Sequence, residues 1–194
     1  MTWDSMTAEA ASQWAERLWT LVLIVWLVLW FGVKRTKMRE TPWERLQHAL
    51  PVMFGFWLLF ARNLRWLSEK FPQGSVAVWW IGLALTAIGV GISIWARLTL
   101  GSNWSGVVTL KQGHELIRSG LYRWIRHPIY TGILLGTIGT AIIEGHLRGW
   151  VGFAVFVATF YRKARREESF LQQEFGVGFE EHVRSTGMFL PRWT

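Results

Sequence analysis

Long apolar blocks separated by short polar segments restrict the fold of this sequence more than any other feature. A window of about 19 residues, which as a helix spans the hydrocarbon core of a bilayer, finds five such blocks. They cover residues 15–33, 46–67, 76–96, 129–143 and 147–161. The last two are short and flank a polar turn, which is typical of a helical hairpin. The sequence therefore predicts an all-α integral membrane bundle with five transmembrane helices, in a single domain of residues 1–194.

The distribution of lysine and arginine predicts how this bundle is oriented. Of the 21 basic residues, sixteen fall in polar segments on one side of the five predicted spans and five on the other. Because basic loops favour the cytoplasmic side, the N-terminus is expected outside and the C-terminus in the cytoplasm. Topology and contact with membrane lipids then account for most of the net charge of +8. No nucleic-acid partner is expected.

The sequence lacks the patterns of the common soluble enzymes. It has no cysteine, which excludes disulfides, thiolate metal sites and cysteine nucleophiles. It contains no nucleophile elbow, phosphate-binding loop or H-E-x-x-H motif. The five histidines do not show metal-ligand spacing, so no metal site is expected. Methyl transfer from a sulfonium suits this inventory, because the donor is already activated and the protein chiefly positions two reactants.

The polar segment 97–128 ends in a predicted helix start. Pro128 suits the first turn of a helix and keeps the preceding His127 out of the helical region. The free N–H groups of such an end, with Arg123 and Arg126 beside them, suit a carboxylate or a phosphate. An interfacial helix cap whose arginines bind lipid phosphates explains the same residues equally well.

The polar segment 162–194 begins with a basic run that contains two acidic residues. Lys163 faces Glu167 at i, i+4 spacing. A solvated, salt-bridged helix face would explain this pair. Glu167 is also expected near the membrane surface, on the same side as His127 and Tyr130, where its carboxylate would hold an amine.

Several short motifs follow one another between residue 95 and the C-terminus. They are Gly101-Ser-Asn-Trp-Ser105, Gly113-His114, Leu116-Ile117, Gly120-Leu121-Tyr122, Arg126-His127-Pro128-Ile129-Tyr130, Glu167-Glu168, Phe175-Gly176 and Leu190-Pro191. In order and spacing they resemble the isoprenylcysteine carboxyl methyltransferase family, in particular its compact five-span prokaryotic members.

The resemblance implies an integral membrane methyltransferase of the inner membrane. It would bind S-adenosylmethionine in a pocket that opens to the cytoplasm, formed by residues 97–128 and 162–194, with a C-terminal helical segment covering it. A lipophilic or lipid-like acceptor would enter from the bilayer. By match to the family's motifs, the cofactor would contact His114, Leu116, Ile117, Tyr122, His127, Pro128, Ile129, Tyr130, Thr131 and Glu167.

The resemblance also implies which residues act on the acceptor. The family has an arginine four residues before the glutamate, where it meets the acceptor's carboxylate; here Lys163 stands at that position, beside Arg162. Lys163, Arg126 and Arg162 are therefore the expected catalytic residues. A lysine offers a point charge in place of a bidentate fork, which leaves ester formation open.

Three alternatives remain from the sequence. A phospholipid N-methyltransferase would use the same cofactor on another acceptor. An NADPH-dependent membrane sterol or enone reductase would share the His-x-x-Tyr-x-Gly run, but it usually has asparagine before the tyrosine and an acidic residue after the glycine, where this chain has Ile129 and Ile133. A non-enzymatic membrane scaffold would use the basic loops to bind anionic lipid.

Overall fold

The computed structural model describes residues 3–31, 36–39, 41–61, 75–104, 109–111 and 116–192. The helices are α1 (Trp3–Trp30), α2 (Pro42–Phe60), α3 (Val76–Leu100), α4 (Pro128–Glu144), α5 (Leu147–Phe175) and α6 (Val177–Ser185). Two short strands, β1 (Thr36–Arg39) and β2 (Thr109–Lys111), pair antiparallel. The fold is thus helical, as predicted, apart from this one ribbon in the described part of the chain.

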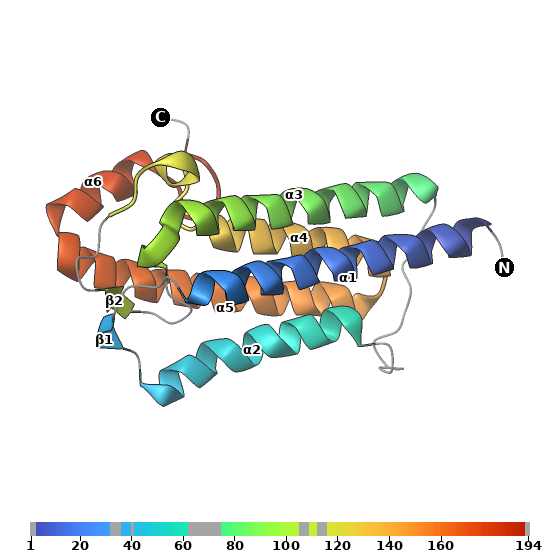
Figure 1. Cartoon of the computed structure of the whole chain (residues 1–194), viewed down its shortest axis with the longest axis horizontal. Coiled ribbons are helices and arrows are strands. Elements are labelled where there is room, and N and C mark those ends of the chain that lie inside the picture. Colours follow the sequence, from blue (N-terminus) through green and yellow to red (C-terminus); the bar gives the residue numbers. More distant parts are fainter. Residues whose placement is uncertain are drawn as a thin grey trace.

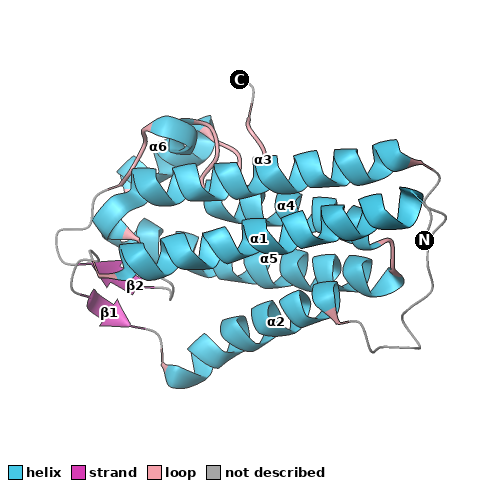
Figure 2. Cartoon of the chain, turned by 45° about the vertical axis from the view of Figure 1, so that its right-hand side comes forward, coloured by secondary structure: helices cyan, strands magenta, loops and turns pink. Residues whose placement is uncertain are grey.

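The long helices run roughly along a common axis and place the polar segments at one end. In Figure 1, the β1–β2 ribbon, the start of α4, the end of α5 and α6 lie at the left, whereas the N-terminus and the α4–α5 turn lie at the right. Figure 2 shows the same arrangement from another side, with α2 crossing the other helices obliquely. The segments that the charge count assigns to the cytoplasm therefore gather at one end of the molecule, which we call the ribbon end.

Helix α2 ends before the predicted second span, 46–67, does. Helix α2 ends at Phe60, and Ala61 has an extended backbone; residues 62–67 of the predicted block lie outside the described residues. The helix also begins earlier than the apolar block does, because Thr41 and Glu44 form a capping box. The Thr41 hydroxyl accepts from the Glu44 amide at 3.3 Å, and the Thr41 amide donates to the Glu44 carboxylate at 2.8 Å.

In the part of the chain that the structure describes, two helical segments are long and apolar enough to cross a membrane. They are Glu9–Trp30, with a mean hydropathy of 1.2, and Val76–Asn103, with 1.9; α4 is a shorter apolar helix. Large apolar side chains also point outward from these helices and from α2, with Leu23, Met53 and Trp80 between 59% and 69% exposed. Such outward faces are typical of a bundle that lies in lipid. The count of five spans stays a prediction.

Glycines bring α3 and α4 into close contact. A Cβ on Gly89 would lie 2.3 Å from the amide nitrogen of Gly136 and 2.5 Å from the carbonyl oxygen of Gly132. The Ser93 hydroxyl donates to the carbonyl of Ile129 at 3.3 Å, across the same interface. The first turn of α4 is thereby held firmly against α3, and that turn carries the residues of the site described next.

Candidate active site

The site is built around His127, which caps the start of α4 at the ribbon end. Pro128 opens the helix, as the sequence predicts, and His127 before it has φ −124° and ψ 59°, outside the helical region. The imidazole is buried, with 7% of the residue exposed. Its surroundings therefore decide its charge and orientation.

Two neighbouring carboxylates of α5 hold this imidazole from both sides. His127 Nδ1 lies 3.4 Å from Oε2 of Glu167, and His127 Nε2 lies 3.3 Å from Oε1 of Glu168. The Tyr130 hydroxyl donates to Oε1 of Glu167 at 2.6 Å. Lys163 Nζ lies 4.0 Å from the same Oε1, one turn earlier on α5. Glu167 is thus bordered by three groups that can donate hydrogen bonds to a carboxylate.

These contacts move the pKa values of the histidine and of both glutamates toward the charged forms. Burial opposes ionisation, but the hydrogen bonds with Glu167 and Glu168 outweigh it and raise the pKa of His127. Burial likewise opposes the charge on the two glutamates, and the hydrogen bonds from His127, with the nearby Lys163 and Arg126, lower the pKa of each carboxyl group. These shifts favour a cationic ring between two anionic carboxylates.

Aromatic rings form one wall of the cluster. The Tyr130 ring stacks on His127 with centroids 5.5 Å apart and on Phe160 of α5 at 4.7 Å. Lys163 Nζ lies 5.6 Å from the centroid of the Tyr130 ring, in cation–π contact with it. The stack keeps Tyr130 in place while its hydroxyl reaches Glu167.

The C-terminal segment hydrogen-bonds along the start of α4. The amides of Arg126 and His127 donate to the carbonyls of Gly187 at 2.9 Å and Met188 at 3.1 Å. The Thr131 hydroxyl donates to the carbonyl of Phe189 at 2.7 Å. Residues far apart in the sequence are thereby fixed beside one another at the His127 cluster.

Arg126 joins the same segment to α5. Its Nε donates to Oε1 of Glu168 at 2.7 Å, and its Nη1 donates to the carbonyl of Thr186 at 2.5 Å. The side chain is largely buried, with 10% exposed. The expectation that Arg126 acts on an acceptor stays a prediction, and its observed contacts hold α5 and the residues after α6 together.

His182 of α6 lies nearby, and its pKa is shifted in the opposite direction to that of His127. Burial, together with the positive charges of Arg118, Arg126 and His127, lowers the pKa of His182 to about 4. His182 and Phe179 are both buried. They belong to the packed side of α6.

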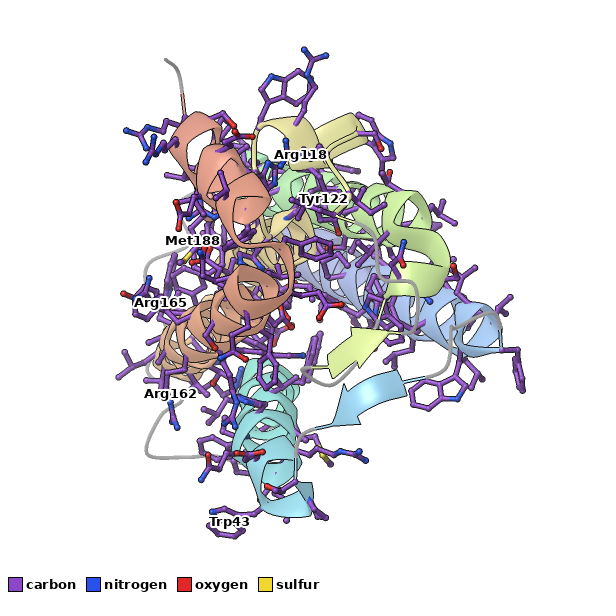
Figure 3. All side chains as sticks on the ribbon, turned by 90° about the vertical axis from the view of Figure 1, so that its left-hand side faces the viewer. Trp43, Arg118, Tyr122, Arg162, Arg165 and Met188 are labelled. Atoms are coloured by element: carbon purple, nitrogen blue, oxygen red, sulfur yellow. The ribbon has the colours of Figure 1, made fainter. Side chains whose placement is uncertain are left out.

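The other predicted site residues differ in how far they are buried. Tyr122 is buried against the C-terminal part of α3, where its hydroxyl donates to the carbonyl of Ala96 at 3.4 Å, and Ile117 packs against the cluster of Ala96, Trp104, Tyr122 and Ile129. Leu116 is partly buried and His114 lies outside the described residues. Arg162 is exposed, and Figure 3, which views the ribbon end, shows it on the outer side of α5 with Arg165.

Sequence reasoning gave no role to three residues that the structure places in the cluster. They are Glu168, Phe160 and Phe189. Glu168 was visible as the second acid of the Glu167-Glu168 pair, but its partners Arg126 and His127 are 42 and 41 positions away in the chain. No spacing rule connects residues so far apart.

The sequence and the fold were compared with those of known proteins. Residues 80–173 match the sequence profile of the isoprenylcysteine carboxyl methyltransferase (ICMT) family. Protein-S-isoprenylcysteine O-methyltransferase A of Arabidopsis thaliana is 33% identical over 136 residues, which are 66% of this chain and 68% of the relative. The chain belongs to the isoprenylcysteine carboxyl methyltransferase family. The protein-S-isoprenylcysteine O-methyltransferase of Dictyostelium discoideum is 27% identical over 86% of this chain and 72% of its own length.

A solved structure of the family has a similar fold. The eukaryotic intramembrane Ras methyltransferase ICMT superposes with a TM-score of 0.52 and 25% sequence identity, over 80% of this chain and 54% of that one. The helical bundle thus resembles a membrane-embedded member of the family. The comparisons do not favour the N-methyltransferase, reductase and scaffold alternatives.

Proposed function

We propose that this chain is a membrane-embedded, S-adenosylmethionine-dependent methyltransferase that acts on a lipophilic carboxylate of the isoprenylcysteine type. Membership of the family and the named activities of its relatives support the reaction. The observation that carries the site assignment is the His127–Glu167–Tyr130 cluster at the start of α4.

The residues of the cluster fit the charged groups of this cofactor. Glu167 is held ionised among three donors, which suits it to take the cofactor's ammonium group. In the first turn of α4, Pro128 has no N–H and the Thr131 amide donates to the carbonyl of His127, so the amides of Ile129 and Tyr130 are left without intrahelical acceptors and suit the cofactor's carboxylate. Together with His127, these residues would hold the amino-acid part of the cofactor.

The remaining family matches complete the proposed cofactor site. Leu116, Ile117 and Tyr122, with His114 outside the described residues, would enclose the rest of the cofactor. When bound there, S-adenosylmethionine supplies a methyl group activated by the adjacent sulfonium. The segment after α6, hydrogen-bonded along Arg126 and His127, would keep water from that methyl group.

On the acceptor side, the protein has to position the acceptor and bind its negatively charged carboxylate. A carboxylate acceptor would take up the methyl group without releasing a proton, so the residues of the site would not have to supply a general base. Lys163 and Arg162 would attract the carboxylate to α5, and the position of Lys163 beside Glu167 and Tyr130 supports this role. Arg126 would act through Glu168 and the C-terminal segment.

The proposal includes the predicted topology. The chain would cross the inner membrane of a prokaryotic cell five times as one domain, with the N-terminus outside and the ribbon end in the cytoplasm, where the cofactor is made. The gathering of the described basic segments at that end supports this orientation.

Titration of S-adenosylhomocysteine into the Glu167→Gln variant tests the site. A hydrogen bond between charged groups contributes about 1.5–3 kcal/mol, so the dissociation constant should rise at least roughly tenfold. Glu181→Gln, an exposed glutamate of α6, is the matched control and should bind as the wild type does. Equal affinity of both variants would refute the assignment of Glu167. Transfer of labelled methyl to N-acetyl-S-farnesylcysteine as a base-labile ester tests the reaction.

A further inference from the structure

Arg45 is a basic residue of α2 that the family resemblance does not single out. Its side chain is partly buried, and its Nε is shielded from solvent without a hydrogen-bond partner among the residues that the structure describes. No described carboxylate forms an ion pair with it. A shielded N–H donor that is left unbonded is unfavourable, so this atom marks a place where a ligand oxygen would be bound favourably.

The packing of α2 on α5 places Arg45 at the level of the His127 cluster. Gly55 of α2 lies against the Phe156 ring of α5, and Glu44 forms an ion pair with Arg166. The two helices therefore run in opposite directions, and each covers about 15–16 Å between these two contacts. One residue after Glu44, Arg45 is thus level with the turn of α5 that carries Lys163, Arg166 and Glu167.

The face of α2 that carries Arg45 points into the bundle. Arg45, Val52 and Leu59 are seven residues apart and share one face of the helix. Val52 and Leu59 pack in the cluster that contains Phe160 and Tyr130. Two turns further toward the ribbon end, Arg45 occupies the same face, on the side of the bundle where Tyr130 meets Glu167 and Lys163.

Comparison with Arg97 shows that an unbonded Nε does not by itself indicate a ligand-binding arginine. The Arg97 Nε is also shielded and unbonded in the described part of the chain. However, its Nη1 and Nη2 each donate at 2.9 Å to a carbonyl, of Gly101 and Leu29, and its guanidinium lies 4.3 Å from the centroid of the Trp104 ring. That guanidinium links α1 to α3. No described contact of this kind engages Arg45.

We propose that Arg45 binds the carboxylate of the lipophilic acceptor and supplies the planar fork that Lys163 cannot offer. A guanidinium binds a carboxylate with two parallel hydrogen bonds, whereas an ammonium group acts as a point charge. In this arrangement α2 contributes the fork and α5 contributes the ammonium of Lys163, on either side of the same anion. The inference rests on the proposed function and determines which acceptor the site selects.

The test compares an acid with its neutral analogue. The ligands are N-acetyl-S-farnesylcysteine and its carboxamide, and the variants are Arg45→Gln, Arg45→Lys and the control Arg184→Gln, which removes the same charge from an exposed position on α6. Arg45→Gln should raise the KM and the dissociation constant of the acid at least tenfold, and Arg45→Lys should raise both less. The affinity for the carboxamide and for S-adenosylhomocysteine should not change, and Arg184→Gln should behave as the wild type.

The following results would overturn the assignment of Arg45 to the acceptor's carboxylate. If Arg45→Gln binds the acid as the wild type does, or loses equal affinity for the acid and the carboxamide, then Arg45 does not bind the carboxylate. A loss seen only in vesicles that contain phosphatidylglycerol would assign Arg45 to a lipid phosphate instead. The binding measurement needs no turnover, so it reports on Arg45 even if the wild type transfers no methyl group to the acid, an outcome that would count against the proposed function alone.

Discussion

Replacing Gly89 by alanine should separate α3 from α4. The added Cβ would lie 2.3 Å from the amide nitrogen of Gly136 and 2.5 Å from the carbonyl oxygen of Gly132, where ordinary contact begins at 3.4 Å. Both neighbours are backbone atoms, so no side chain can rotate away. The two helices must therefore move apart by about 1 Å, and a densely packed interface loses much of its dispersion energy over such a gap.

The size of the effect is best measured against Gly91→Ala on the same helix. A Cβ at Gly91 meets nothing within 4 Å. Any gain in helix propensity, up to about 1 kcal/mol, is common to both variants and cancels. Overpacking costs about 1–3 kcal/mol, so Gly89→Ala should be less stable than Gly91→Ala by that amount. Since about 1 kcal/mol lowers the Tm of a protein of this size by about 2–4 °C, the difference should be a few to roughly ten degrees.

The measurement is thermal unfolding of both variants in one detergent, followed by methyl transfer at a temperature where both are folded. Activity of Gly89→Ala should fall as well, because Gly132 lies in the second turn of the helix whose first turn carries the proposed cofactor site. Equal Tm values for the two variants would refute the claim that this glycine contact holds the site in place.

Two further predictions concern the buried charges. Glu168→Gln removes the carboxylate that pairs with the buried Arg126, so it should lower the free energy of unfolding by about 3 kcal/mol and the Tm by roughly 6–12 °C. Glu181→Gln, at an exposed position, should leave the Tm unchanged. Equal Tm values for the two variants would show that the ion pair is dispensable. Stability should also peak near pH 6.5, the ordinary pKa of histidine. The raised pKa of His127 contributes stability below that pH that is lost as pH rises, and the lowered pKa of His182, about 4, contributes stability that is lost as pH falls from 6.5 toward 4. Tm measured against pH should lose its alkaline decline in His127→Gln and part of its acid decline in His182→Gln, and unchanged profiles would contradict these signs.

Much of the fold could be predicted because the lipid-facing helices are long and apolar. Blocks of hydrophobic residues located α3, α4 and the first half of α5 within a few residues, whereas α1 begins at Trp3, well before the first block at residue 15. Helix α2 ends at Phe60, and the backbone is extended at Ala61, although the apolar block predicted from the sequence continues to residue 67. Apolar content says where a chain prefers lipid, but hydrogen bonds at the caps decide where a helix ends.

The site was predictable to the extent that local sequence builds it. The Pro128 helix start and the spacing of Lys163 and Glu167 are local features, and both are present in the structure. The roles of Glu168 and Arg45 depend on which helix lies beside which, and composition and periodicity carry no such information. Only the arrangement of α2, α4 and α5 brings these side chains to one end of the bundle.

Helix α5 is one unbroken rod of 29 residues, about 43 Å long. Its first half lies in the predicted membrane segment, and Glu167 lies about 30 Å along it from Leu147. Because a rigid rod turns as a whole, a tilt of about 10° would carry the carboxylates sideways by roughly 5 Å relative to the far end of the helix. Membranes of different thickness favour different tilts. Because Glu167 and Glu168 are bonded to residues at the start of α4, the cluster would move with the bundle, and its depth relative to the lipid headgroups would then depend on the thickness of the membrane.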